Sequence, residues 1–188
     1  MVPEPPGAYR IPTALRDLVM IDLLEITGST TATAELLTMS QPNVSRRYRS
    51  VARDLGLERH SDAPVGRRFG HTSWITLLRR GVNHHRLANG VLRVGSGREL
   101  EPLIADAPWA HWVLLGRQQQ QEWRSLLALE LLDAVAVADL PELTSEEAAQ
   151  LSLVEVCPRR DGQVVLMCRR DPLVLEICSR ICSWMELP

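Results

Sequence analysis

The 188-residue chain contains no lysine, one phenylalanine, two tyrosines and four cysteines. The cysteines all lie in the last third and form no Cys-x-x-Cys pair: Cys157, Cys168, Cys178 and Cys182. Such spacing excludes a disulfide scaffold and a zinc finger. No apolar run approaches the length of a bilayer span, and the start "MVPEPPGAYRIP" lacks the basic flank and apolar core of a signal peptide. These absences predict a cytoplasmic protein that does not enter a membrane.

Catalytic patterns are also missing. The sequence contains no nucleophile-base-acid set, no pair of acids in a glycosidase pattern, no phosphate loop and no metal cluster. His84 and His85 are adjacent, so they point apart on a helix, and no cysteine or carboxylate completes a metal site. We therefore expect neither an enzyme nor a bound metal or cofactor.

Charge is divided unequally along the chain. Residues 1–98 hold 14 arginines and 8 acids, a net charge of +6, whereas residues 99–188 hold 7 arginines and 15 acids, a net charge of −8. Within residues 41–98 there are 12 arginines and 3 acids, a net charge of +9. A basic amino-terminal part joined to an acidic remainder indicates a nucleic-acid module linked to a second domain.

Three short helices are expected after a flexible lead-in over residues 1–12. Thr13 can cap a first helix that runs to about Glu25 and ends at Gly28. Ser29 or its threonine neighbours start a second helix, and Ser40 starts a third that Gly56 closes. This arrangement is typical of a helix-turn-helix motif.

The third helix, within "MSQPNVSRRYRSVARDLG", is expected to be amphipathic. Val44, Tyr48, Val51 and Leu55 recur at helical spacing and form one buried stripe. Polar and basic residues then fall on an exposed face. The stretch "RHSDAPVGRRFGHT" follows, and its Pro64–Gly66 turn predicts a short hairpin, or wing.

Beyond the wing, "SWITLLRRGVNHHRL" predicts a linker helix within residues 71–90. From Val91 onward strands and helices alternate, with helices expected over "RELEPLIADA" and "RQQQQEWRSLLALELL". Asp161-Gly162 is a strong hairpin signal. This alternation predicts a sheet that is parallel at first and gains an antiparallel hairpin, followed by a closing helix. Leu173, Ile177, Ile181 and Trp184 form an apolar stripe on that helix, which we expect to pack against the sheet or form a dimer contact.

The stretch "STTATAELLTMSQPNVSRRYRSVARDLG" resembles the helix-turn-helix of the LysR-type transcriptional regulators. The family pattern is Ser-Phe-Thr-x-Ala-Ala-x-x-Leu-x-x-Ser-Gln-Pro-x-x-Ser, followed by Leu-Gly at the end of the recognition helix. Ten positions match without a gap: Ser29, Thr31, Ala34, Leu37, Ser40, Gln41, Pro42, Ser45, Leu55 and Gly56. Weaker likenesses to the family's effector domain occur at "VLRVGSG", "ELLDAVAVADLPE" and "RRDPLV".

The resemblance implies an α/β protein with a winged helix-turn-helix over residues 13–70, a linker helix over 71–90 and one small α/β lobe over 91–188. Family members carry a two-lobed domain like a periplasmic binding protein, with ligand between the lobes. Sequence for about one lobe is present here, so we expect a truncated effector domain without a complete cleft, which argues against a small-molecule effector.

The implied function is a bacterial, dimeric, sequence-specific regulator of transcription whose partner is double-stranded DNA, at an interrupted inverted repeat. Gln41 and Asn43 would meet base edges, and Arg46 or Arg47 would reach guanine or phosphate. The full predicted DNA-binding set is Ser40, Gln41, Pro42, Asn43, Ser45, Arg46, Arg47, Arg49, Arg59, Arg67 and Arg68. The linker helix would form the homodimer through Trp74, Ile75, Leu78 and Leu87.

Two alternatives remain open at this stage. Thr30, Thr33 and Ala52 replace family residues at packing positions, which is compatible with an interaction protein that has lost specific DNA binding and pairs with another regulator. The four cysteines could act as a redox sensor, although buried structural thiols are far more common.

Overall fold

The computed structural model describes residues 10–70, 72–101, 107–138, 141–159 and 162–185. The chain divides into two compact units. The helical unit comprises Arg10–His85 and Leu115–Leu131, and the sheet unit comprises Arg86–Leu114 and the residues from Leu132 onward. Residues 115–131, which the sequence placed with the rest of 91–188, thus cluster with the amino-terminal helices.

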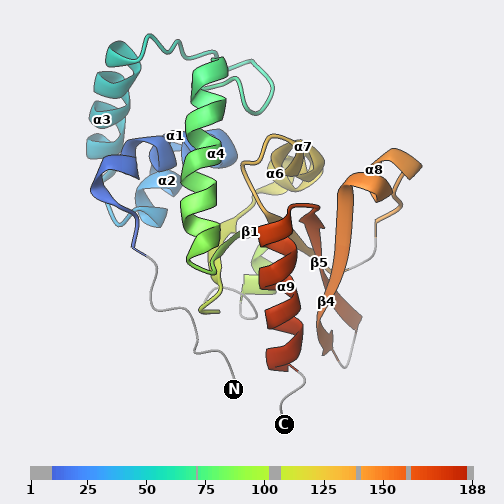
Figure 1. Ribbon diagram of the computed structural model, residues 1–188. Coiled ribbons are helices and arrows are strands. Elements are labelled where there is room, and N and C mark those ends of the chain that lie inside the picture. The colour runs from blue at the N-terminus through green and yellow to red at the C-terminus, as the bar shows by residue number, and fades with distance from the viewer. Residues whose placement is uncertain (1–9, 71, 102–106, 139–140, 160–161, 186–188) are drawn as a thin grey trace. The chain divides into compact units, whose positions relative to one another are not determined.

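The described residues of the helical unit form a short 3-10 turn, five complete α-helices and the start of a sixth, α4. Figure 1 labels these α-helices. The elements are η1 (Thr13–Leu15), α1 (Arg16–Thr27), α2 (Thr30–Leu36), α3 (Gln41–Asp54), α4 (Ser73–Ala88), α6 (Arg117–Gln121) and α7 (Trp123–Ala128). Helix α4 starts in this unit and ends in the sheet unit.

Local sequence explains how the first three helices begin and end. Gly28 ends α1 with a positive φ of 64°, which costs glycine little because it has no Cβ. The Ser29 hydroxyl accepts a hydrogen bond from the Ala32 amide at 3.3 Å and caps α2. Ser40 occupies the N-cap position of α3, but its side chain makes no capping hydrogen bond. Pro42 fits the first turn of α3, where amides have no intrahelical acceptor.

A single apolar core joins α1, α2, α3 and the start of α4. Of the predicted stripe on α3, Val44 and Tyr48 are buried, whereas Val51 and Leu55 are only half-buried. Ala52, which lies four residues after Tyr48, is the third buried residue of α3. The buried members of this core are Met20, Ile21, Leu24, Ala34, Val44, Tyr48, Ala52, Leu57, Phe69 and Ile75.

The sheet unit contains one five-stranded sheet with the strand order β2-β1-β3-β5-β4. Its strands are β1 (Leu92–Ser96), β2 (Ala110–Leu114), β3 (Ala134–Val137), β4 (Leu151–Arg159) and β5 (Gly162–Arg169). Strand β1 is parallel to β2 and β3, whereas β5 is antiparallel to β3 and β4. The predicted parallel start and antiparallel hairpin are both confirmed.

Helices in the second half follow the prediction less closely. The expected helix over "RQQQQEWRSLLALELL" is broken at Glu122 into α6 and α7. Within the expected helix "RELEPLIADA" the structure describes the 3-10 turn η2 (Arg98–Leu100) and Glu101, and residues 102–106 lie outside the described residues. Sequence reasoning missed α8 (Ser145–Gln150), although Thr144 and Glu147 form a capping box that its Thr-x-x-Glu spacing announces.

Helix α9 (Pro172–Met185) covers one face of the sheet, as Figure 1 shows. Val174, Ile177 and Cys178 pack in the same core as alternate residues of β1, β3 and β5. Leu173 is half-buried against this core. The closing helix therefore packs back onto its own sheet, one of the two arrangements expected from its apolar stripe; the side chains of Ile181 and Trp184 lie outside the described set.

A buried aspartate ties three strands of the sheet unit together. Asp133, immediately before β3, has no exposed side-chain surface and accepts hydrogen bonds from the Arg93 amide at 2.7 Å and from the guanidinium of Arg86. The Arg169 guanidinium donates to its other oxygen at 3.1 Å. Burial alone would raise the pKa of Asp133, but Arg86, Arg169 and the Arg93 amide outweigh it and lower the pKa below the ordinary 3.8.

We expect Asp133→Asn to lower the free energy of unfolding by about 3–5 kcal/mol at neutral pH, because removing one partner strands a buried charge. Since folding lowers the pKa of Asp133, its contribution is complete above the ordinary value and is lost as the pH falls toward the folded value. Urea unfolding between about pH 2 and 7 should therefore show less loss of stability below about pH 4 in the variant than in the wild type. If the free energy of unfolding fell equally with decreasing pH in the variant and the wild type, this role of Asp133 would be contradicted.

Candidate nucleic-acid interface

The polar face of α3 starts with Gln41, which is exposed and held in place by two hydrogen bonds. Its Nε2 donates to the hydroxyl of Thr30, the first residue of α2, and to the hydroxyl of Ser45, each at 3.0 Å. These bonds fix the side chain across the junction of the two helices. A preordered amide costs less conformational entropy when it meets a ligand.

Further along α3, the exposed face becomes basic. Asn43, Arg46 and Arg49 are exposed, and the Arg49 Nε donates to the Ser45 carbonyl at 3.2 Å. A hollow of about 410 Å³ runs beside them, lined by Met39, Asn43, Arg46, Arg47 and Ser50. Its donor groups match the acceptors presented by phosphates and guanine edges.

Arg47 lies differently from Arg46. Its Nε donates to the carboxylate of Asp17 on α1 in an ion pair, and this hydrogen bond raises the pKa of Arg47. The guanidinium is therefore directed toward α1. The pair is more than a third exposed, so its contribution to stability is small.

The loop between α3 and α4 carries the other predicted arginines, but it is not a β-hairpin. Residues 57–70 form successive turns with no strand. The backbone amide of His60 donates to the Arg68 carbonyl at 2.8 Å across the loop, and turns close at Ala63 and Arg67. Three backbone amides of the loop donate to a carboxylate of α1, so they do not pair with the carbonyls of a facing strand as a hairpin would require.

That carboxylate is Glu25 of α1, which has no exposed surface. Its two oxygens accept hydrogen bonds from the backbone amides of Gly66 at 2.9 Å, Arg68 at 3.2 Å and Phe69 at 2.6 Å. Burial raises the pKa of Glu25, while the three amides and the charge of Arg79 partly offset the rise. One buried side chain thus holds the last third of the loop.

Phe69 is also tied to α3. The Tyr48 hydroxyl donates to the Phe69 carbonyl at 3.1 Å, and the two rings meet edge to face with centroids 5.3 Å apart. Arg59 places its guanidinium 5.1 Å from the centre of the Phe69 ring. Phe69 thus contacts α1 through its amide, α3 through its carbonyl and ring, and the exposed Arg59 guanidinium through the face of its ring.

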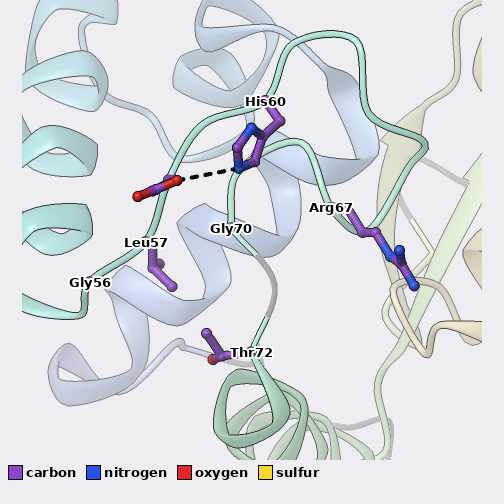
Figure 2. Close-up of a pocket in the computed structure, with 7 residues that line it drawn as sticks. Gly56, Leu57, His60, Arg67, Gly70 and Thr72 are labelled. Carbon is purple, nitrogen blue, oxygen red and sulfur yellow. Dashed lines mark ion pairs between the residues drawn. The ribbon is translucent and has the colours of Figure 1, made fainter.

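A second hollow, of about 470 Å³, lies where the loop meets the end of α3 and the start of α4. His60 and Arg67 are among the residues that line it (Figure 2). The His60 Nε2 lies 3.7 Å from the Glu58 carboxylate. Arg59 and Arg67 are exposed, whereas Arg68 is buried. Two of the three predicted loop arginines are therefore available to a ligand.

The predicted dimer residues on α4 also separate into two groups. Ile75 and Leu87 are buried in the cores of their own units, and Trp74 is half-buried against the helical core. Leu78 is 43% exposed, and its neighbour Leu77, absent from the predicted set, is 66% exposed. The helical pattern of α4 did not distinguish its inward face from its outward one, since both carry leucine or isoleucine.

Sequence reasoning also missed the acids of α1. Asp22 accepts from the Arg79 Nε at 2.7 Å, with both side chains 3% exposed, and so fixes α4 to α1. Asp22 and Glu25 stand within the otherwise apolar run "VMIDLLEI". Acids in such a run are the signal that could have revealed them, because a buried carboxylate requires donors from elsewhere in the chain.

Two of the four cysteines lie close together in the sheet unit. Cys168 and Cys178 are buried with their Sγ atoms 3.3 Å apart, a pairing that sequence spacing did not indicate; Cys157 and Cys182 lie outside the described side chains. Among the described residues no group of three or more His, Cys, Asp or Glu could hold a metal ion.

No described helix is both long and apolar enough to cross a membrane.

The chain was compared with family models, with curated proteins and with solved structures. No family model and no curated protein matches it. Among solved structures, it is similar to the LysR family regulator HinK from Pseudomonas aeruginosa, at 19% identity over 77% of this chain and 52% of that one, with a TM-score of 0.30. CrgA, a LysR-type regulator from Neisseria meningitidis, matches at 18% identity over 76% of this chain and 53% of that one, with a TM-score of 0.33.

A third match is full-length CbnR in complex with its target DNA, at 18% identity over 76% of this chain and 53% of CbnR, with a TM-score of 0.30. The chain thus spans about half the length of each of these three solved structures.

We expect Glu25→Gln to lower the free energy of unfolding by about 1–3 kcal/mol, because the amide has one acceptor oxygen for three buried donors. The matched control is Glu35→Gln on the exposed surface of α2, which should change stability by less than about 0.5 kcal/mol. Urea denaturation measures both. Equal midpoints for the two variants would show that the loop does not depend on the Glu25 carboxylate.

Proposed function

We propose that this protein is a sequence-specific DNA-binding regulator of transcription of the LysR type. The observation that carries the proposal is the start of α3: Gln41 is preordered between Thr30 and Ser45, and exposed Asn43 and Arg46 follow it. A helix that presents polar and basic groups from its first turns suits the major groove, where each base pair shows a distinct pattern of donors and acceptors.

The proposal assigns a role to each exposed residue of this face. Gln41 and Asn43 face base edges, and Arg46 faces guanine or a nearby phosphate. Ser40, Pro42, Ser45 and Arg49 lie where they would approach the sugar-phosphate backbone, which adds affinity without sequence information. Arg59 and Arg67 would contact DNA from the loop. Arg47 and Arg68, which form ion pairs within the chain, are given structural roles instead.

A titration of the full chain against labelled genomic fragments, followed by fluorescence anisotropy, tests the proposal. Some fragments should bind far more tightly than bulk DNA at moderate salt. Affinity should fall steeply with salt, by about 0.9 logarithmic units per tenfold rise for each phosphate contacted. Equal affinity for every fragment would exclude a sequence-specific regulator.

The same titration separates the two adjacent arginines. Arg46→Ala should weaken binding to the preferred fragment by about 1–3 kcal/mol and bulk DNA by less, because a base contact is lost. Arg47→Ala should have a smaller effect, because that guanidinium already bonds to Asp17. Arg98→Ala, an exposed arginine of the sheet unit, controls for the change in net charge. Equal losses for Arg46→Ala on all fragments would assign Arg46 to phosphate alone.

We also propose a homodimer formed through the exposed side of α4. Leu77 and Leu78 are neighbouring exposed leucines on this helix, and burying both would remove apolar surface from water. The interface is thus assigned to Leu77 and Leu78, with Trp74 at its margin, and not to Ile75 or Leu87.

Sedimentation velocity should show that Leu77→Glu is a monomer at concentrations where the wild type is a dimer, because a carboxylate cannot be buried unpaired. Leu153→Glu, which alters a leucine 45% exposed on β4, is the matched control and should remain dimeric. Dimeric Leu77→Glu would place the interface elsewhere.

A further inference from the structure

The segment Leu115–Leu131 contributes to the helical unit although it is inserted between two strands of the sheet unit. The chain passes from the sheet unit to the helical unit after β2 and returns to the sheet unit before β3. Three of its side chains contact the end of α1 and the loop between α3 and α4. Gln119 makes the first contact, with its Nε2 donating to the Thr27 carbonyl at 3.2 Å.

The second contact is an ion pair between Glu122 and Arg68. The Arg68 Nη2 lies 3.2 Å from one carboxylate oxygen of Glu122 and 3.1 Å from the other. Arg68 also donates from its Nε to the Ala63 carbonyl at 3.2 Å, and its side chain is 10% exposed. The guanidinium is therefore bonded to the loop on one side and to Glu122, whose side chain is 29% exposed, on the other.

The third contact is apolar. Gly66 has a φ of +88°, and a Cβ placed on it would lie 2.5 Å from the Leu129 Cδ1. The loop can approach Leu129 this closely only because position 66 has no side chain. Gly66 also donates its amide to Glu25, so Leu129 and Glu25 both contact the same residue of the loop.

These contacts bear on the two exposed arginines of the loop. Arg67 stands between Gly66 and Arg68, both of which are held, and Arg59 lies over Phe69, whose amide bonds to Glu25. The direction in which Arg59 and Arg67 project therefore depends on how firmly residues 66–69 are held. Glu122 is a charged group of the segment Leu115–Leu131 that bonds directly to this part of the loop, through Arg68.

We propose that Glu122 is a positioning residue for DNA binding, which acts through Arg68 to hold the loop 57–70 in the conformation that presents Arg59 and Arg67. The inference rests on the proposed function. It makes α6 and α7 a working part of the DNA-binding unit. It also makes Arg68 a tether for the loop, in place of a contact to phosphate.

The test compares Glu122→Gln with Glu176→Gln in the full chain. Both variants remove one carboxylate from an ion pair with arginine, and the Glu176–Arg180 pair lies on α9, away from the loop in sequence and in the other unit. Hydrogen exchange without DNA should rise at least fivefold for peptides covering residues 58–70 in Glu122→Gln, with an unchanged urea midpoint. Binding to the preferred fragment should weaken at least fivefold relative to Glu176→Gln.

The direction of the affinity change discriminates between the two roles of Arg68. If Arg68 contacted phosphate, freeing it and removing a negative charge would strengthen binding, so unchanged or tighter binding by Glu122→Gln overturns the proposal. The exchanged pair Arg68→Glu/Glu122→Arg keeps the ion pair but loses the hydrogen bond to the Ala63 carbonyl. It should therefore restore part of the protection of the loop and part of the DNA affinity relative to Glu122→Gln, which no phosphate contact at position 68 would allow. Arg68→Lys, which keeps the charge but loses the fixed fork of donors, should weaken binding in the same direction as Glu122→Gln.

Unchanged hydrogen exchange in both Glu122→Gln and Arg68→Lys would also refute the inference. Because exchange is measured without DNA, that result is distinct from failure of the proposed function, which would appear as equal binding of wild-type protein to every fragment.

Discussion

The helical unit depends on the hydrogen bonds between the Glu25 carboxylate and the backbone amides of the loop. This carboxylate is buried on α1 and accepts three backbone amides from one turn of the loop that follows α3. A carboxylate in an apolar core is costly unless donors surround it, and loop amides need an acceptor when they are buried. The carboxylate and the amides satisfy each other's hydrogen-bonding needs. The loop therefore forms turns around Glu25 in place of a paired hairpin.

The same solution occurs in the sheet unit, where Asp133 is surrounded by arginines and one amide. Its oxygens join the end of α4 to β1 and β5, and its backbone bonds to Arg93 and Arg169 as well. Glu25 is held chiefly by amides and has a raised pKa, whereas Asp133 is held by guanidinium groups and has a lowered one. The difference follows from the charge of the donors: amides offset desolvation in part, but paired cations exceed it.

Arginine serves two purposes in this chain. Arg79, Arg86 and Arg169 neutralise buried acids, and Arg68 pairs with Glu122. Arg46, Arg49, Arg59 and Arg67 are exposed on α3 and the loop. Net charge alone overstates the basic surface of the amino-terminal half, because several of its cations are already paired inside the fold.

Much of the architecture could be read from local patterns. Turn chemistry and hydrophobic periodicity, which are local properties, set the helix boundaries near Gly28, Ser29 and Ser40, the order of strands along the chain and the antiparallel pairing of β4 with β5. The polar start of α3 was predictable for the same reason, since Ser-Gln-Pro marks the first turn of a helix whose buried stripe leaves Gln41 and Asn43 outside.

What the sequence by itself determined, then, is where the first three helices begin, the parallel start and antiparallel hairpin of the sheet, and which residues start α3, because turn chemistry and hydrophobic periodicity are local. Only the tertiary structure decided how the arginines divide and which leucines of α4 face outward. It also decided that the loop bonds to Glu25 and that residues 115–131 join the helical unit. Some ion pairs join residues that lie tens of positions apart in the sequence, such as Asp17 with Arg47 and Glu122 with Arg68. The sequence does not indicate which acid pairs with which arginine. Such pairs form only when packing brings them within a few ångströms, where desolvation and Coulomb attraction become large enough to select one arrangement.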